Sequence, residues 1–170
     1  MAAIKQLEKT IGDLFKSAPP MPEKSKQSLV NAWPWIALVF GVIQLFAAWS
    51  LWGLTRFVER VNDATNSLSL YYTGHAAGLS STDKLVIYLA LLMLLVDGVL
   101  LLMAYPELKK RSRRGWDLLF LGSLLNLAYA LVSLFIRDRG VGSFLFSLLG
   151  SAVGFYLLFQ VKDKYGSKKA

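Results

Sequence analysis

Four long apolar stretches occupy most of this chain, at residues 33–54, 85–105, 118–136 and 141–161. Each holds about 20 residues, the length that an α-helix needs to cross about 30 Å of hydrocarbon at 1.5 Å per residue. A segment in lipid must satisfy its own backbone hydrogen bonds, and continuous apolar segments do so as helices. The sequence therefore predicts an all-α, polytopic membrane protein with four transmembrane helices arranged as two hairpins.

Composition agrees with this class and restricts the chemistry. Hydrophobic residues make up 55% of the 170 residues, and cysteine is absent, which excludes thiolate catalysis and cysteine-based metal sites. His75 is the single histidine, and we interpret it as a surface turn residue. The sequence has no recognisable catalytic triad, phosphate-binding loop or zinc-ligand spacing, so we expect no enzyme activity, catalytic residue, metal or cofactor.

The distribution of basic residues predicts the topology. The leader carries five, the loop between the second and third stretches carries five and the tail carries four, against five on the other side. By the positive-inside rule, both termini are cytoplasmic. The first apolar stretch begins only at Trp33, so we expect it to be retained and not cleaved as a signal peptide. We expect the chain to be located in a bacterial cytoplasmic membrane.

The basic loop is a candidate lipid contact. Its five cations are Lys109, Lys110, Arg111, Arg113 and Arg114. Because the loop lies between two predicted spans, anionic headgroups on the cytoplasmic side are nearer to it than any nucleic acid, and we expect no nucleic-acid partner. Setting the topology is an alternative role that is sufficient by itself.

Residues 1–18 form a predicted amphipathic helix on the cytoplasmic side. Apolar side chains recur on one face, at Ile4, Leu7, Ile11, Leu14 and Phe15. Prolines at the start of a 19–32 linker end this helix. The apolar face fits either the membrane surface or a protein surface. The transmembrane domain then covers 33–161, and a basic cytoplasmic tail covers 162–170.

The helical pattern of apolar residues continues after the first span. We assign residues 55–83 to a segment on the outer side of the membrane. An apolar stripe continues from Leu54 to Tyr72, and Gly74 is the predicted helix end. Contact with lipid and contact with a partner predict the same stripe.

The two hairpins show a weak internal similarity. An offset of 81 residues places Gly41 on Gly122, and an offset of 56 places Gly98 on Gly154. Since each hairpin begins and ends in the cytoplasm, the pattern indicates a parallel duplication. Chance similarity between short apolar patterns is the alternative.

Asp97 is the most informative polar residue, because it lies inside the second apolar stretch, far from other charges. A carboxylate at that depth should face the interior and pair. Asn126 in the third stretch lies at a similar depth, with Gln44 of the first somewhat nearer mid-membrane. These three residues fit either a proton- or cation-linked site or hydrogen bonds that hold helices together.

Small residues define a second pattern, in which another helix backbone can approach closely. They are Gly122 in the third stretch and Ser147, Gly150, Ser151 and Gly154 in the fourth. We expect them to pack the third and fourth helices together, with an interface to another subunit as the alternative.

No motif here is specific enough to indicate a family. The leading hypothesis is a non-catalytic membrane interaction or assembly protein, such as an accessory subunit of a larger membrane complex, with other membrane proteins or a second copy as partners. The alternative is a small proton- or cation-linked transporter, or a channel-like oligomer, centred on Asp97.

Overall fold

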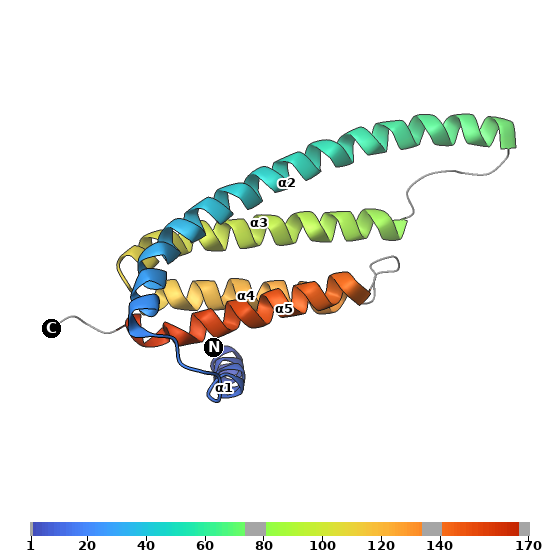
Figure 1. Cartoon of the computed structure of the whole chain (residues 1–170). Helices are drawn as coiled ribbons and strands as arrows, with labels where there is room; N and C mark the ends of the chain where they lie inside the picture. Colours follow the sequence, from blue (N-terminus) through green and yellow to red (C-terminus); the bar gives the residue numbers. More distant parts are fainter. Residues whose placement is uncertain (1, 74–80, 134–140, 167–170) are drawn as a thin grey trace.

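The computed structural model describes residues 2–73, 81–133 and 141–166. Within these residues the chain is all-helical and contains no strand, which confirms the all-α part of the predicted fold class. The elements are α1 (Ala2–Leu14), α2 (Glu23–Thr73), α3 (Ser81–Lys109), α4 (Arg113–Ser133), α5 (Val141–Gln160) and the short 3₁₀ helix η1 (Lys162–Lys164) (Figure 1). His75 and the turn between α4 and α5 lie outside the described residues.

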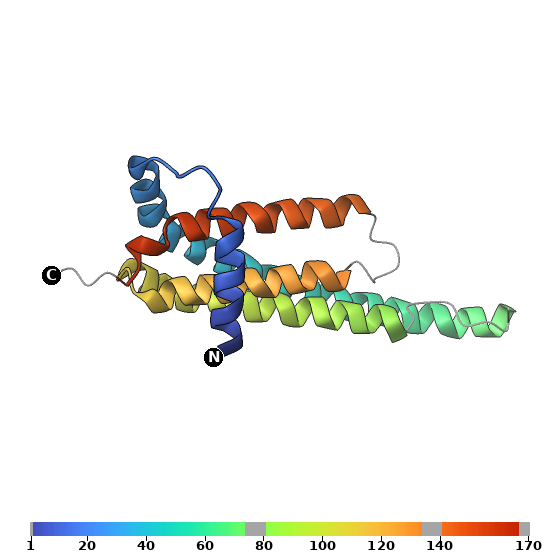
Figure 2. The same cartoon turned by 90° about the horizontal axis from the view of Figure 1, so that it is seen from below.

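Helices α2 to α5 run up and down in chain order, and each packs on the next. Helix α1 instead runs across α4 and α5 near one end of the bundle, as the two views in Figures 1 and 2 agree. We call this end, which carries the α3–α4 turn, the basic end. Helix α2 continues well past the other end of α3 (Figure 2).

Helix α2 begins at Glu23, so it includes residues 23–32 that the sequence assigned to a linker. Val30 and Ala37 of this helix are buried in the core, with Trp33 packed beside them. This inward stripe has few members, which is why the hydrophobic pattern did not reveal it. Pro34 lies inside α2, where proline removes a backbone donor and favours a kink. The early part of α2 bends in Figure 1. The helix ends at Thr73, next to the predicted end at Gly74.

Two glycines allow α2 and α3 to approach closely. An ideal Cβ built at Gly41 would lie 3.0 Å from the Leu102 side chain and 3.2 Å from the Gly98 carbonyl oxygen. A Cβ at Gly98 would meet Leu45 at 3.0 Å and the Gly41 carbonyl at 3.3 Å. The two helices therefore cross with a leucine of each lying over a glycine of the other.

The second hairpin does not repeat this contact, although the predicted duplication aligns Gly41 with Gly122 and Gly98 with Gly154. A Cβ at Gly122 would meet the Asp97 carboxylate, and a Cβ at Gly154 would meet nothing within 4 Å. The aligned glycines therefore have different packing roles, and the duplication stays a prediction.

The main buried cluster lies at the basic end. Its largest members with almost no exposed surface are Trp116, Phe120, Leu108 and Leu158, joined there by Val161 and Tyr165. Residues 162–166, the described part of the predicted basic tail, therefore pack against this core through Tyr165. Many large apolar side chains further along α2 to α5 are exposed, with Trp49 at 75% and Phe146 at 79%.

Among the described residues, two helices are long and apolar enough to cross a membrane, within Glu23–Tyr72 and Lys84–Lys109. Helix α5 contributes a shorter apolar segment, Leu148–Gln160, and α4 opens with charged residues at Arg113, Arg114 and Asp117.

Candidate functional site

The structure brings together the three polar residues of the apolar stretches. Gln44 Nε2 of α2 donates a hydrogen bond to Asp97 Oδ2 at 2.7 Å, and Asn126 Nδ2 of α4 donates to the same oxygen at 3.0 Å. Asn126 Nδ2 also lies 3.0 Å from the Gly122 carbonyl oxygen, one turn earlier in α4. Asp97 of α3 is only 5% exposed, so a single carboxylate oxygen connects three helices in the interior.

Two oxygens of this cluster receive no hydrogen bond in the described part of the chain. They are Asp97 Oδ1 and Gln44 Oε1, and both are fully buried. Oδ1 lies against Gly122, where an ideal Cβ would be 2.8 Å away. A larger residue at position 122 would therefore displace the carboxylate or α4.

A cavity of about 300 Å³ lies beside the cluster, between α2, α3 and α4. Its walls combine Asp97, Gln44 and Asn126 with Leu51, Met93, Leu94 and Tyr129, among others. The cavity borders the cluster, but Asp97 Oδ1 and Gln44 Oε1 remain buried. In this arrangement the carboxylate acts first as an acceptor that holds three helices in register.

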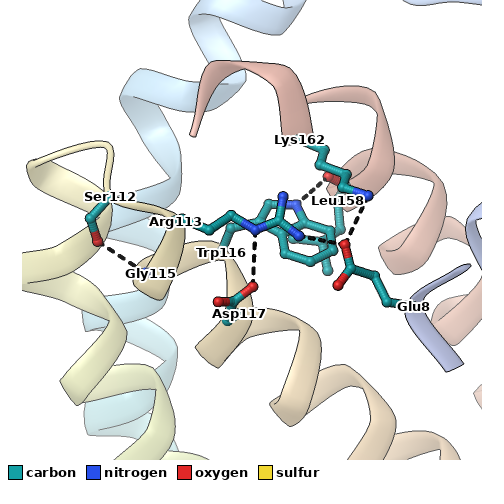
Figure 3. A network of polar contacts seen from close by, with 8 residues as sticks. All are labelled: Glu8, Ser112, Arg113, Gly115, Trp116, Asp117, Leu158 and Lys162. Carbon is teal, nitrogen blue, oxygen red and sulfur yellow. Dashed lines mark hydrogen bonds and ion pairs between the residues drawn. The ribbon is translucent and has the colours of Figure 1, made fainter. Parts of the chain in front are cut away.

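A second polar network lies at the basic end, where α1 meets α4 and η1 (Figure 3). Glu8 Oε1 of α1 is hydrogen-bonded by the Arg113 guanidinium and lies 2.8 Å from Lys162 Nζ. Arg113 Nε also donates to Asp117 Oδ1 at 3.1 Å. Burial alone would raise the pKa of Glu8, but hydrogen bonds from Lys162 and Arg113, together with their positive charges, lower it below the ordinary value.

Trp116 is the centre of this network, with no exposed surface. Its indole Nε1 donates to the Leu158 carbonyl oxygen at 2.8 Å, one of the carbonyls in the last turn of α5 that have no partner within that helix. The Arg113 guanidinium lies 4.2 Å from the ring centroid, and the ring stacks on Phe120 at 5.3 Å. Trp116 therefore joins α4 to the end of α5 by polar and apolar contacts.

The predicted amphipathic helix packs on protein along part of its apolar face. An ideal Cβ at Gly12 would lie 2.9 Å from the Phe159 ring, and the Phe15 ring stacks on Phe159 at 6.2 Å. Leu14 by contrast is 72% exposed, and Ile4 and Leu7 are also exposed. This leaves apolar side chains of α1 uncovered by the described chain.

The proline segment after α1 is attached to α5. Tyr156 Oη and Gln160 Nε2 both donate to the Pro19 carbonyl oxygen, at 2.8 and 3.3 Å. The Met21 backbone N–H in turn donates to Gln160 Oε1 at 3.1 Å. Residues 19–22 therefore follow a defined path over α5 and do not act as a free linker.

The basic loop is shorter than expected, because α3 ends at Lys109 and α4 begins at Arg113. Arg111 adopts a φ of 52°, and the N–H groups of Arg111 and Ser112 donate to the carbonyls of Leu108 and Glu107. This is a Schellman-type helix end with arginine at the position that usually holds glycine. Gly115 then allows the chain to reverse, since its Cβ would meet the Leu108 backbone at 2.7 Å.

The five cations of the predicted lipid contact have different surroundings. Lys109 and Lys110 are exposed, and Lys109 Nζ lies 5.4 Å from the Trp35 ring centroid. Arg111 donates to Asn31 Oδ1 at 3.0 Å, and Arg113 is held by Glu8 and Asp117. Arg114 is exposed. Three of the five cations are thus directed outward.

The two glycines of the fourth predicted span are not close to another described helix. A Cβ at Gly150 or at Gly154 would meet no atom within 4 Å, and Ser151 is half-buried. The Ser147 side chain lies outside the described part of the structure. Helices α4 and α5 do pack together, but largely through aromatic residues near the basic end and not through these glycines.

The sequence reasoning missed Glu8 and Lys162 as partners. A signal was present, because Glu8 lies between Lys5 and Lys9 and one turn after Ile4. Such a position does not reveal which distant cation it meets.

Comparison of the chain with protein-family models, with curated proteins and with solved structures finds no match.

Proposed function

We propose that this chain is a four-span membrane protein with both termini in the cytoplasm and a non-catalytic role in assembly, binding the helices of other membrane proteins. The observation that carries this proposal is the outer part of α2, an extended helix with an exposed apolar stripe. At 1.5 Å per residue, the 51 residues of α2 measure roughly 77 Å, about 33 Å more than the 29 residues of α3. Part of this excess lies beyond the outer end of α3 (Figure 2).

The stripe has the spacing of a helix-binding face. Leu54, Phe57, Val61, Leu68 and Tyr71 are all exposed and follow one another at intervals of 3, 4, 7 and 3. Thr55 and Asn62, on another face of the same helix, are buried. The outer part of α2 therefore has one face packed in the chain and a different, apolar face that the described chain leaves open, which is what a partner helix needs.

The exposure of the apolar helices supports the membrane setting. Only 17% of the apolar window of α2 and 11% of that of α3 is buried within the chain. A core helix of a soluble protein would be mostly buried, so these helices need another apolar environment, which a bilayer supplies. The shorter apolar segment of α5 reaches the predicted span length when residues 141–147 are included.

Cysteine labelling in intact cells tests the topology. The chain has no native cysteine, so single cysteines at the exposed positions Lys110 and Tyr72 report the two ends. An impermeant thiol reagent should label Tyr72→Cys in intact cells, and Lys110→Cys only after permeabilisation. Labelling of both positions in intact cells would contradict the four-span topology.

Photo-crosslinking tests the assembly role. A photoreactive residue at Phe57 or Leu68 should give discrete crosslinked bands, whereas one at Asn62, on the packed face, should crosslink within the chain. Mass spectrometry of the bands separates a second copy from a different protein. A single monomeric band for every position, with lipid adducts alone, would reject assembly through this face.

A proton- or cation-linked transporter is the second candidate, favoured by one observation: a lone carboxylate beside a cavity of about 300 Å³. Its test is reconstitution in vesicles carrying a pH or sodium gradient. Transport would appear as dissipation of the gradient in the native chain that Asp97→Asn abolishes. Equal leak in native and substituted vesicles would leave Asp97 with its structural role only.

A further inference from the structure

A cleft at the basic end gathers cations from four separate elements. It has a volume of about 840 Å³ and lies between α1, the start of α2, the start of α4 and the end of α5 with η1. Six basic side chains line it: Lys5, Lys9, Lys16, Lys26, Arg113 and Lys162. Residues far apart in sequence thus contribute positive charge to one hollow.

The cations of the cleft exceed the acids. The acidic side chains that line it are Glu8, Asp13 and Asp163, which leaves a net charge of +3 on the lining. Glu8 is occupied by Arg113 and Lys162, and Asp13 pairs with Lys16 at 2.5 Å. The cleft therefore has positive charge that its own acids do not neutralise.

Three of these lysines account for the net positive charge of the cleft. The side chains of Lys5, Lys9 and Lys26 form no ion pair or hydrogen bond with any residue that the structure describes. Lys5 and Lys9 lie one turn apart on α1, and Lys26 approaches from the first turns of α2. Three ammonium groups around one hollow match the several oxygens of a phosphate group.

The cleft also continues into an apolar surface. Phe15 and Phe159 line it beside the lysines. From Gln160, which also lines the cleft, the residues at steps of 4, 3 and 4 back along α5 are Tyr156, Val153 and Leu149, and the last two are exposed at 57% and 63%. The segment 19–22 crosses this side of α5 at Gln160 and Tyr156, and beyond it the exposed Val153 and Leu149 continue away from the charged cleft, where the acyl chains of an amphiphile with an anionic head would lie.

We propose that this cleft binds the phosphate headgroup of an anionic phospholipid, with the acyl chains lying along the exposed side of α5. This rests on the proposed membrane setting and adds a defined lipid site to it. The site differs from the α3–α4 loop, since its unpaired cations come from α1 and α2. A bound lipid would also hold α1 on the bundle, because its headgroup contacts lysines of both α1 and α2.

The test compares two charge-matched variants of the full chain in mild detergent. Lys5→Gln, Lys9→Gln and Lys26→Gln together remove the unpaired cations of the cleft. Arg56→Gln, Arg60→Gln and Lys84→Gln together remove the same charge at the other end of the molecule. Binding of phosphatidylglycerol, with phosphatidylcholine as the zwitterionic lipid, is measured by native mass spectrometry, and unfolding temperatures verify that both variants fold.

The cleft variant should bind phosphatidylglycerol roughly 10- to 100-fold more weakly, because each lysine near a headgroup contributes up to about a fivefold factor. The control variant should stay within about twofold of the native chain. Equal weakening in both variants, or none in the cleft variant, would overturn the site. Displacement of the lipid by millimolar inorganic phosphate would overturn the lipid in favour of a soluble phosphate.

Membrane integration is scored on the same variants by alkaline extraction of membranes. A cleft variant that stays in the membrane but still binds phosphatidylglycerol as tightly as the native chain would reject the lipid site alone. A native chain that is extracted at alkaline pH would reject the membrane proposal itself. The two failures therefore give different results.

Discussion

Gly122 leaves the space that the Asp97 carboxylate occupies, because a Cβ at position 122 would lie 2.8 Å from Asp97 Oδ1. Gly122→Ala should therefore destabilise the bundle by about 1–3 kcal/mol, the usual effect of overpacking, although alanine favours the helix by up to about 1 kcal/mol. Gly150→Ala is the matched control, since a Cβ there meets nothing within 4 Å. Thermal unfolding in detergent should show a lower midpoint for the first variant only, and equal midpoints would refute the close contact.

The carboxylate of Asp97 accepts hydrogen bonds from two side-chain amides. We therefore expect its acceptor oxygen, and not its charge, to determine its contribution to the stability of the fold. Asp97→Asn keeps one oxygen for Gln44 and Asn126, and its new N–H₂ has a buried acceptor without a partner in Gln44 Oε1. We expect a change within about 1 kcal/mol for Asp97→Asn.

Asp97→Leu removes the acceptor, which leaves Gln44 Nε2 unpaired among the described residues and Asn126 Nδ2 with the Gly122 carbonyl alone. Its cost should be about 1–3 kcal/mol for each donor left unpaired. Denaturant titration of the two variants in detergent measures the difference. Equal destabilisation by Asn and Leu would mean that the negative charge itself is required.

The contact between Gln44, Asp97 and Asn126 was accessible from sequence because depth in a membrane helix follows from counting residues at 1.5 Å each. A buried carboxylate also restricts its own position, since it must find donors at its own depth. The helical class of the chain came from the length of its apolar stretches, and the helix at residues 2–14 came from hydrophobic periodicity.

Other features depend on packing that a pattern does not contain. Helix α2 starts at Glu23, and its first turns place Val30 in the core at the basic end. The residues around Val30 in the sequence do not indicate that core. The Gly150 and Gly154 pattern looked like a close helix contact, yet both positions are open within the chain. Small residues permit a close approach, but which helix approaches is decided by the rest of the fold.

The contact of α1 with the bundle should weaken in acid. The pKa of Glu8 in the folded chain lies below its ordinary value of 4.5, so its stabilising effect is complete above that value and is lost as the pH falls through the lowered pKa. A spin label on Thr10→Cys should therefore become more mobile below about pH 4. The label reports α1 itself, since Thr10 lies within that helix.

Two variants separate Glu8 from the other acids of α1. Glu8→Gln should make the label more mobile at neutral pH and remove most of the acid response. Asp13→Asn should keep the response, because the partner of Asp13 is Lys16 on the same segment and not the bundle. An acid response that persists in Glu8→Gln would assign it to another group.

Tyr165 should make the fold sensitive to alkali. Its ring is buried at 4% exposure, its hydroxyl has no partner among the described residues, and burial raises the pKa of Tyr165 to about 12. The unfolded chain ionises a tyrosine near pH 10, so between about pH 10 and 12 the unfolded state loses a proton that the folded state keeps, and stability falls. Tyr165→Phe should remove this part of the alkaline loss and leave the midpoint at pH 7 equal or slightly higher, because an unpaired buried hydroxyl is eliminated. Unfolding midpoints of the two chains at pH 7 and pH 11 test this, and parallel losses would show that Tyr165 ionises freely in the fold.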